Sequence, residues 1–231
     1  MSEHFELRGR SILIAGASGG LGSALAAELS RRGATLTLVG RRTDALADLD
    51  VPGHRLSLDL RDPRSCERAV REAVDFGGGL DVVINAVGVI AFGTVEELTI
   101  DHMEDLFMTN TFIPISLAKA GLAAMSEGGV IVNISGVIAE QNMPGMAAYG
   151  ASKAAVKSFD EALAREARRR KIRVLDARPP HTETGLARRP LEGVAPKMAT
   201  GLSPTAVAKV IVDAVVSGAT DLPSAAFTPA G

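Results

Sequence analysis

The chain lacks the residues that disulfide and zinc chemistry require. Its 231 residues include one cysteine, Cys66, which excludes an internal disulfide bond and leaves no cluster of thiolate ligands. Because Cys66 falls in a predicted helix, we interpret it as a buried or half-buried structural thiol. Aromatic residues are scarce as well: there is no tryptophan, and Tyr149 is the single tyrosine. The position of this lone phenol is therefore a clue to function.

Neither charge nor hydrophobicity is concentrated in one part of the chain. The formal net charge is −2, so no basic excess favours nucleic acid or an anionic membrane as a partner. Residues 1–20 carry early charges and a short apolar run, unlike a signal peptide. No run reaches the ~20 apolar residues that cross a bilayer. We therefore expect a soluble, cytoplasmic protein with small-molecule partners.

The chain does contain a regular alternation of strand and helix. Short aliphatic and β-branched runs predict strands at 11–15, 35–40, 54–60, 80–88, 128–135 and 172–179. Helical apolar spacing predicts helices at 21–33, 43–49, 63–76, 101–125, 147–170 and 203–218. Unbroken apolar strand centres favour a parallel sheet that is covered on both faces. We predict an α/β fold, a doubly wound parallel sheet of the Rossmann type, in one domain over residues 1–231.

A glycine-rich turn joins the first predicted strand to the first predicted helix. The stretch AGASGGLGSALA places Gly16, Gly20 and Gly22 at this turn. Residues without side chains let backbone amides approach a pyrophosphate at the positive end of a helix. The turn therefore predicts dinucleotide binding, and an ordinary βα turn is the alternative.

The end of the second predicted strand indicates the choice of nicotinamide cofactor. An acidic residue at this position would accept hydrogen bonds from the ribose hydroxyls. The chain has Gly40, Arg41 and Arg42 instead. Guanidinium groups bind a 2′-phosphate with charge-assisted hydrogen bonds, so NADP(H) is favoured over NAD(H). The alternative is that both arginines occupy the solvated start of a helix.

Tyr149 and Lys153 share one face of a predicted helix, one turn apart. A nearby ammonium group favours phenolate and lowers a phenol pKa that is otherwise about 10. Such a tyrosine is suited to donate or accept a proton near neutral pH. The pair predicts an acid/base site, although the same spacing also occurs by chance in surface helices.

Taken together, these motifs resemble the short-chain dehydrogenase/reductase family over essentially the full chain. The matching pieces are GASGGLG at 16–22, Asp59 after the third strand, NAVG at 85–88, Asn110 in TNTF, NIS at 133–135 and YGASK at 149–153. The resemblance implies that a carbonyl and an alcohol are interconverted by hydride transfer. It implies Tyr149 as the catalytic acid/base, and Lys153 as the residue that binds the nicotinamide ribose and tunes the tyrosine.

The resemblance also implies roles for other residues. Asn110 would hold a water in the proton relay, Asp59 would contact the adenine, and Asn85 would support the central strands. With the two arginines, the expected cofactor-binding set is Gly16, Ser18, Gly20, Leu21, Gly22, Arg41, Arg42, Asp59, Leu60, Asn85, Ala86, Val87, Gly88, Tyr149, Lys153, Pro179 and Thr184. No metal site is expected. Family members often form homo-oligomers, so a dimer or tetramer is expected.

The chain departs from the family at one catalytic position. A serine that polarises the substrate carbonyl is normal there, and this chain has Gly136. Ser135 precedes it, but neighbouring side chains on a strand point to opposite faces. A local twist or bulge is needed for Ser135 to act instead. We expect such a twist and a catalytic Ser135, with a purely structural hydrogen bond as the alternative. Further along, Pro180 replaces a usual glycine, and His181 either faces the substrate or is an ordinary loop residue.

Two other functions are compatible with parts of the sequence. A non-catalytic dinucleotide-binding redox sensor or scaffold would explain Gly136, but Asn110, Tyr149 and Lys153 argue against it. A glycine-turn methyltransferase has less support. The substrate is not specified; the segment 180–202 lacks aromatic residues, which favours a small or flexible apolar molecule.

Overall fold

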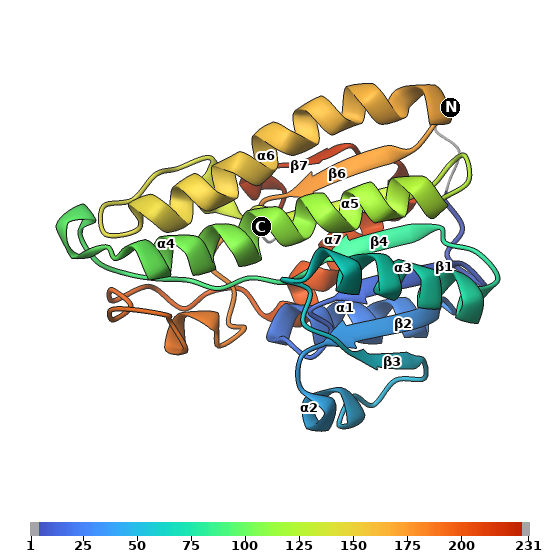
Figure 1. Cartoon of the computed structure of the whole chain (residues 1–231), viewed down its shortest axis with the longest axis horizontal. Helices are drawn as coiled ribbons and strands as arrows, with labels where there is room; N and C mark the ends of the chain where they lie inside the picture. Colours follow the sequence, from blue (N-terminus) through green and yellow to red (C-terminus); the bar gives the residue numbers. More distant parts are fainter. Residues whose placement is uncertain (1–4, 228–231) are drawn as a thin grey trace.

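The computed structural model describes residues 5–227 and has three layers, with a sheet between two layers of helices (Figure 1). The strands of the described chain are β1 Ser11–Ala15, β2 Thr35–Gly40, β3 His54–Ser57, β4 Val82–Asn85, β5 Val130–Ile134, β6 Arg173–Ala177 and β7 Asp221–Leu222. All neighbouring strands are parallel, in the order β3-β2-β1-β4-β5-β6-β7. The predicted doubly wound α/β sheet is confirmed. The order reverses between β1 and β4, which opens a crevice at their carboxyl ends.

Helices cover both faces of the sheet. They are α1 Gly20–Arg31, α2 Thr43–Ala47, α3 Pro63–Gly77, α4 Ile100–Phe107, α5 Ile113–Ala124, α6 Ala147–Ala167 and α7 Pro204–Ser217. Short 3₁₀ turns lie at η1 Val95–Glu97, η3 Val137–Ala139, η4 Arg168–Arg170, η5 Leu186–Arg188 and η6 Ser224–Phe227. Helices α1 and α7 pack together, while α3, α5 and α6 form the other layer.

The alternation of side chains along β1 builds both halves of the core. Ile12 and Ile14 pack with the residues of α1 and α7, whereas Leu13 and Ala15 pack with those of α3 and α5. All four side chains are fully buried. Full burial of one aliphatic side chain contributes about 1.5–3 kcal/mol, so an apolar run that is covered on both faces is strongly stabilised.

Local sequence signals fix the ends of two helices. Helix α3 begins after Asp62, whose carboxylate accepts a hydrogen bond from the Arg64 amide, and Gly78, with a φ of 70°, caps its C-terminal end. Helix α7 begins in the same way after Ser203, and Gly218, with a φ of 85°, caps its C-terminal end. Side-chain caps satisfy the first free amides, and glycine accepts the left-handed conformation at the end.

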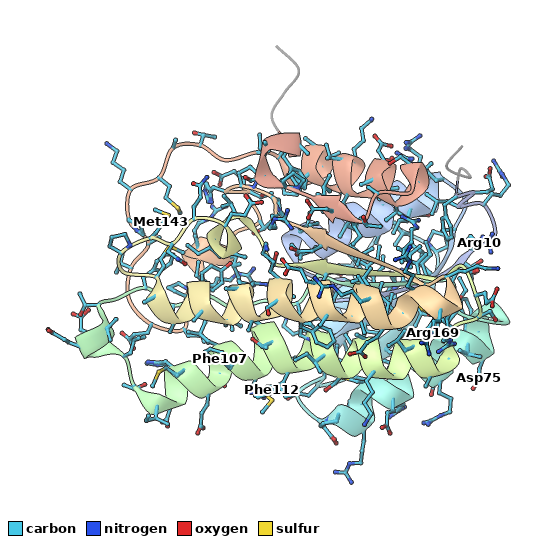
Figure 2. The ribbon with its side chains drawn as sticks, turned by 90° about the horizontal axis from the view of Figure 1, so that it is seen from above. Arg10, Asp75, Phe107, Phe112, Met143 and Arg169 are labelled. Carbon is cyan, nitrogen blue, oxygen red and sulfur yellow. The ribbon has the colours of Figure 1, made fainter. Side chains whose placement is uncertain are left out.

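The predicted helix 101–125 contains an irregularity that the sequence does not indicate. Between α4 and α5 the chain makes a π-helical turn, η2 Met108–Phe112. Figure 2 shows the long helix that α4, η2 and α5 form, lying beside α6. The extra residue of a π turn changes which side chains face α6, and such turns are frequent at functional sites. Asn110 lies in this turn.

The same segment, Ile100–Ala124, passes a test of length and apolar composition for crossing a membrane. It is the one such helix among the described residues, and core helices pass this test as well. Its α5 part contacts α3, β4, β5 and α6. We therefore interpret it as a helix of the core.

Four strands, β3, β4, β5 and β6, are shorter than predicted, and β7 was not predicted. Strand β4 ends at Asn85, where the Asn85 side chain accepts a hydrogen bond from the Val87 amide as the backbone leaves the sheet. Strand β3 ends at Ser57. Strand β7 has two residues, too few to show an apolar alternation in the sequence.

Candidate active site

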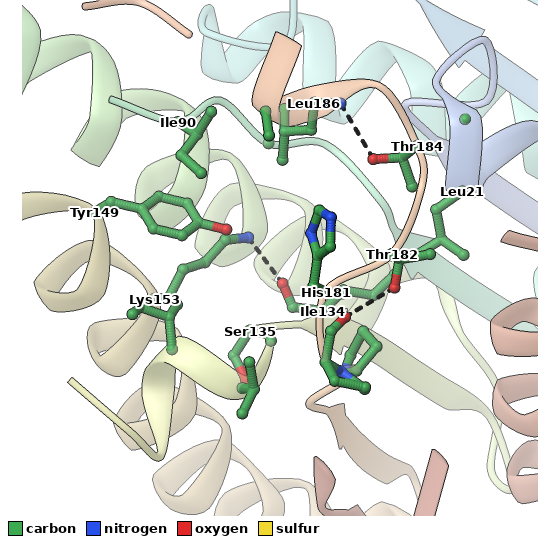
Figure 3. Close-up of a pocket in the computed structure, with 18 of the residues that line it drawn as sticks. Leu21, Ile90, Ile134, Ser135, Tyr149, Lys153, His181, Thr182, Thr184 and Leu186 are labelled. Carbon is green, nitrogen blue, oxygen red and sulfur yellow. Dashed lines mark hydrogen bonds between the residues drawn. The ribbon is translucent and has the colours of Figure 1, made fainter. Parts of the chain in front are cut away.

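Two adjoining cavities lie at the carboxyl end of the sheet. The first has a volume of about 260 Å³ and contains Tyr149 and Lys153 (Figure 3). The second has a volume of about 210 Å³ and contains Arg41 and Arg42. The cavities share the wall residues Gly19, Ala86, Val87, Gly88 and Arg189. A long ligand with two different ends fits this arrangement.

The glycine turn between the cavities has no room for side chains. Gly16 has a φ of 80°, and a Cβ on it would lie 2.8 Å from the backbone of Ala86. A Cβ on Gly22 would lie 2.1 Å from the Gly16 carbonyl oxygen. No side chain caps the first turn of α1, whose N-cap is Gly19. Its amides are therefore suited to a phosphate group, and the turn fits a dinucleotide.

Charged residues surround the second cavity. Arg41 and Arg42 come from the end of β2, and Asp59, Leu60 and Arg61 come from the segment after β3. Hydrogen bonds from Arg61 hold the pKa of Asp59 below its usual value. Two exposed guanidinium groups at this edge are suited to an additional phosphate.

Tyr149 and Lys153 both face the first cavity from α6 (Figure 3). The Lys153 ammonium donates a hydrogen bond of 2.8 Å to the carbonyl oxygen of Ile134. Burial lowers the pKa of Lys153 to about 8, although nearby Asp176 acts in the opposite direction. Burial also raises the pKa of Tyr149 to about 12. In the protein alone, desolvation of the phenol thus outweighs the lowering that the spacing of Tyr149 and Lys153 predicts.

Asn110 is fully buried and connects three segments around the site. Its side-chain oxygen accepts from the Val89 amide, and its nitrogen donates to the Val89 carbonyl oxygen, each at 2.9 Å. The nitrogen also donates to the Ser152 hydroxyl on α6. A Cβ on Gly88 would lie 3.6 Å from the Asn110 oxygen and 3.7 Å from the Lys153 nitrogen. Both polar atoms therefore border the same small space beside Gly88.

Ser135 is committed to a structural hydrogen bond. Its hydroxyl is completely buried and donates to Asp176 on β6. The other oxygen of Asp176 accepts from the buried Arg178 at 2.5 Å, and Arg178 also donates to Glu140 and Asp221. The backbone does twist, but at Gly136, whose φ of 81° leaves Ser135 directed at Asp176. This geometry favours the structural alternative for Ser135 over the catalytic role that the sequence suggests.

The cavities contain most of the residues that the sequence predicts. The first is lined by Gly20, Leu21, Ala86, Val87, Gly88, Ser135, Tyr149, Lys153, Pro179 and Thr184. The second is lined by Gly16, Ser18, Arg41, Arg42, Asp59, Leu60, Ala86, Val87 and Gly88. Gly22, Asn85 and Asn110 line neither cavity. Asn85 instead donates to Asn133 on the neighbouring strand, as a strand-supporting residue would.

Other lining residues escape sequence reasoning. Arg189 lies between the two cavities, and Arg61 beside Asp59. The apolar wall of the first cavity is formed by Ile90, Ile138, Met143, Met146, Leu186 and Met198. These residues come from separate segments of the chain, so no spacing in the sequence reveals them. Only the position of Arg61, directly after Asp59 and Leu60, gives a signal.

The chain combines a parallel doubly wound sheet, a glycine-rich turn at its carboxyl end, and a tyrosine and a lysine in the adjoining cavity. This combination is typical of a Rossmann-type oxidoreductase. The family model for short chain dehydrogenases matches residues 10–194. The chain belongs to the short-chain dehydrogenase/reductase family.

Individual relatives and structures agree with this assignment. The chain is 33% identical to a dehydrogenase/reductase SDR family protein 7-like of Anopheles gambiae, over 96% of this chain and 77% of the relative. It is 31% identical to mouse 3-ketodihydrosphingosine reductase, over 92% of this chain and 70% of the relative. A short chain dehydrogenase from Burkholderia cenocepacia, solved in complex with NADP, superposes with a TM-score of 0.83 at 25% identity, covering 97% of this chain and 100% of that one.

Proposed function

We propose that this protein is an NADP(H)-dependent oxidoreductase that interconverts a carbonyl and an alcohol, with Tyr149 as the proton donor and acceptor. The observation that carries the proposal is the position of Tyr149 and Lys153 in an apolar cavity that adjoins the dinucleotide cradle. The whole chain 1–231 would act as one domain. An oxidoreductase of this family needs both parts, a cradle for the cofactor and a proton donor beside the reacting carbon.

In the direction of reduction, NADPH would supply the hydride when bound. The Tyr149 hydroxyl would donate its proton to the developing alkoxide oxygen. Because burial raises the pKa of Tyr149 to about 12, the phenolate needs a stabilising charge. The Lys153 ammonium, one turn along α6, supplies it and would also hold the nicotinamide ribose.

The space beside Gly88 supports a route for returning the proton. The Asn110 side-chain oxygen and the Lys153 nitrogen both border it. A water hydrogen-bonded to these two atoms would pass a proton from solvent towards Lys153 and Tyr149. Asn110 would then act as the residue that holds this water, as the family resemblance implies.

The preference for NADP(H) rests on Arg41 and Arg42, which line the second cavity. Their charges would bind the 2′-phosphate, and the acidic residue that follows them, Asp44, is paired with Arg42 at 3.6 Å. The Burkholderia cenocepacia relative of known structure was solved with NADP. Asp59 and Leu60 would contact the adenine from the opposite wall.

The apolar wall indicates the kind of substrate. Three methionines, Met143, Met146 and Met198, line the first cavity with aliphatic residues. Methionine side chains adapt to different apolar shapes. We infer a flexible apolar ketone or aldehyde, in keeping with the name of the 3-ketodihydrosphingosine reductase relative. A homo-oligomer is also proposed, because Phe112 is 52% exposed on the long helix (Figure 2).

The test is NADPH oxidation with a panel of aliphatic and aromatic ketones and aldehydes of increasing chain length. Tyr149→Phe keeps the ring and removes the proton, so kcat on the best substrate should fall by about 10²-fold or more. Binding of NADPH, followed by its fluorescence, should be retained. Phe159→Leu, a change further along α6, serves as the control. Full turnover by Tyr149→Phe would refute the role of the phenol.

A further inference from the structure

The developing charge on a carbonyl oxygen is best stabilised by more than one donor, and Tyr149 supplies one. The polar side chains of the first cavity offer few others. Ser135 donates to Asp176, and the Thr182 hydroxyl donates to the Pro180 carbonyl oxygen at 2.8 Å. The Lys153 ammonium donates to Ile134 and faces the proposed ribose position. Thr184 and Arg189 also line this cavity and retain donor capacity, since the Thr184 hydroxyl accepts from the Leu186 amide and Arg189 donates from Nε to the Gly185 carbonyl oxygen. A further donor for the substrate is a residue of this wall whose position the backbone fixes.

His181 is such a residue. Its imidazole projects into the cavity that Tyr149 also lines (Figure 3). The Nε2 atom lies 3.3 Å from the Glu183 carboxylate, and the side chain is 33% exposed. No described residue is hydrogen-bonded to Nδ1. The imidazole is thus held at one nitrogen by a carboxylate, while the other nitrogen is available to a ligand in the cavity.

The backbone around His181 fixes the position of the ring. The Leu202 amide donates to the His181 carbonyl oxygen at 2.9 Å. The Gly201 amide donates to the Glu183 carboxylate at 2.9 Å, and this bond lowers the pKa of Glu183. A Cβ on Gly201 would lie 2.7 Å from the Cδ2 atom of His181, so the ring packs directly on the backbone. Pro180, which precedes the histidine, restricts the backbone further.

We propose that His181, oriented by Glu183, donates a hydrogen bond from Nδ1 to the substrate carbonyl oxygen. The proposal rests on the reductase function given above. Glu183 accepts a hydrogen bond from Nε2–H, and the ring protonated at both nitrogens donates to the substrate oxygen from Nδ1–H. The proton that remains on the product oxygen still comes from Tyr149, and His181 keeps its own. His181 is then a catalytic residue in contact with the substrate, and Glu183 is a positioning residue.

Two substitutions of His181 test the contact. His181→Leu removes the donor and should lower kcat/KM by about 10²-fold, as the loss of one oxyanion donor does elsewhere. His181→Gln retains an amide donor and should recover part of this loss. NADPH affinity should stay within about twofold, since the contact is with the carbonyl. The matched control is His54→Leu, because His54 also pairs with a glutamate, Glu72 at 3.2 Å, and lines neither cavity.

A double-mutant cycle tests the role of Glu183. Glu183→Gln should lower kcat/KM by about tenfold in the wild type and by much less in the His181→Leu background. If Glu183 only held the Gly201 amide, its substitution would have the same effect in both backgrounds. Thermal unfolding of each variant separates loss of the contact from loss of the fold.

The outcomes distinguish this proposal from the reductase function. If Tyr149→Phe loses turnover while His181→Leu keeps the wild-type kcat/KM, His181 has no catalytic contact and the reductase stands. Equal losses in His181→Leu and His181→Gln, with equal loss of NADPH affinity, would also overturn the contact. A wild type that reduces no carbonyl with NADPH would overturn both.

Discussion

Gly136 has a backbone conformation that other residue types rarely adopt. Its φ of 81° and ψ of 164° fall in a region used almost only by glycine. The space around it is open, since a Cβ would lie 3.8 Å from the nearest atom, the Pro179 carbonyl oxygen. The obstacle to a serine here is thus the backbone angle. Insertion of the family serine would require the end of β5 to change its path.

We therefore predict that Gly136→Ser lowers the free energy of unfolding by roughly 1–3 kcal/mol without raising kcat/KM. Ser135→Ala should lower stability by about 1 kcal/mol, the value of one hydrogen bond, and change kcat/KM only a few-fold. Urea unfolding and steady-state kinetics measure both effects. The opposite pattern, a large loss of activity in Ser135→Ala alone, would restore the catalytic role for Ser135.

Asp160 is a buried carboxyl group on α6, the helix that also carries Tyr149 and Lys153. One of its oxygens accepts from Asn133 at 2.6 Å, and the other has no partner among the described residues. Burial raises the pKa of Asp160 to about 8, with nearby Asp176 acting in the same direction. The folded protein therefore holds a proton that the unfolded chain releases near pH 4, and stability is lost as the pH rises towards 8.

Asp160→Asn removes this titration. Between pH 5 and pH 9 the free energy of unfolding of the wild type should fall further than that of the variant, by at least about 1.4 kcal/mol, the equivalent of one pKa unit. Lys153 titrates in both proteins, so its contribution to the pH dependence of stability cancels when the two are compared. The free energies are measured by urea unfolding at the two pH values. The control is Asp75→Asn, a change of an exposed carboxylate. Identical pH dependence in wild type and variant would contradict a raised pKa for Asp160.

The residues that follow β2 are proposed to set the preference between NADPH and NADH. Arg41→Ala with Arg42→Ala should weaken NADPH binding by at least about tenfold, or 1.4 kcal/mol, and leave NADH binding nearly unchanged. Titration by cofactor fluorescence measures both affinities, and the effect should shrink at high salt, since both arginines are exposed. Equal binding of NADPH and NADH by the wild type would contradict the preference.

Elements with strong local signals could be predicted from the sequence, and those set by tertiary contacts could not. β1 was predicted with its observed bounds because five consecutive apolar or small residues are followed by glycine. The π turn at Asn110 has no pattern of its own; it accompanies the hydrogen bonds of Asn110 to Val89 and Ser152. β7 depends on pairing with β6, and two residues carry too little information.

For the whole molecule, the topology was predictable because alternating strands and helices allow few arrangements. Tyr149 and Lys153 could be selected as candidate residues because their spacing places a phenol and an ammonium group on one face of a helix. The direction of the Ser135 side chain could not be predicted, because it depends on a hydrogen bond to Asp176 from another strand. The apolar wall of the first cavity could not be predicted either, because its residues come together only in the folded chain.

The central claim is that this protein transfers hydride from a nicotinamide cofactor to a carbonyl carbon. The most direct measurement uses NADPH that carries deuterium at C4 of the nicotinamide, with the alcohol product analysed by mass spectrometry. Deuterium should appear on the carbinol carbon of the product with the wild type, and at least about 10²-fold more slowly with Tyr149→Phe. An alcohol product without deuterium from either face of the nicotinamide, or bound NADPH that is never oxidised by any carbonyl, would contradict it.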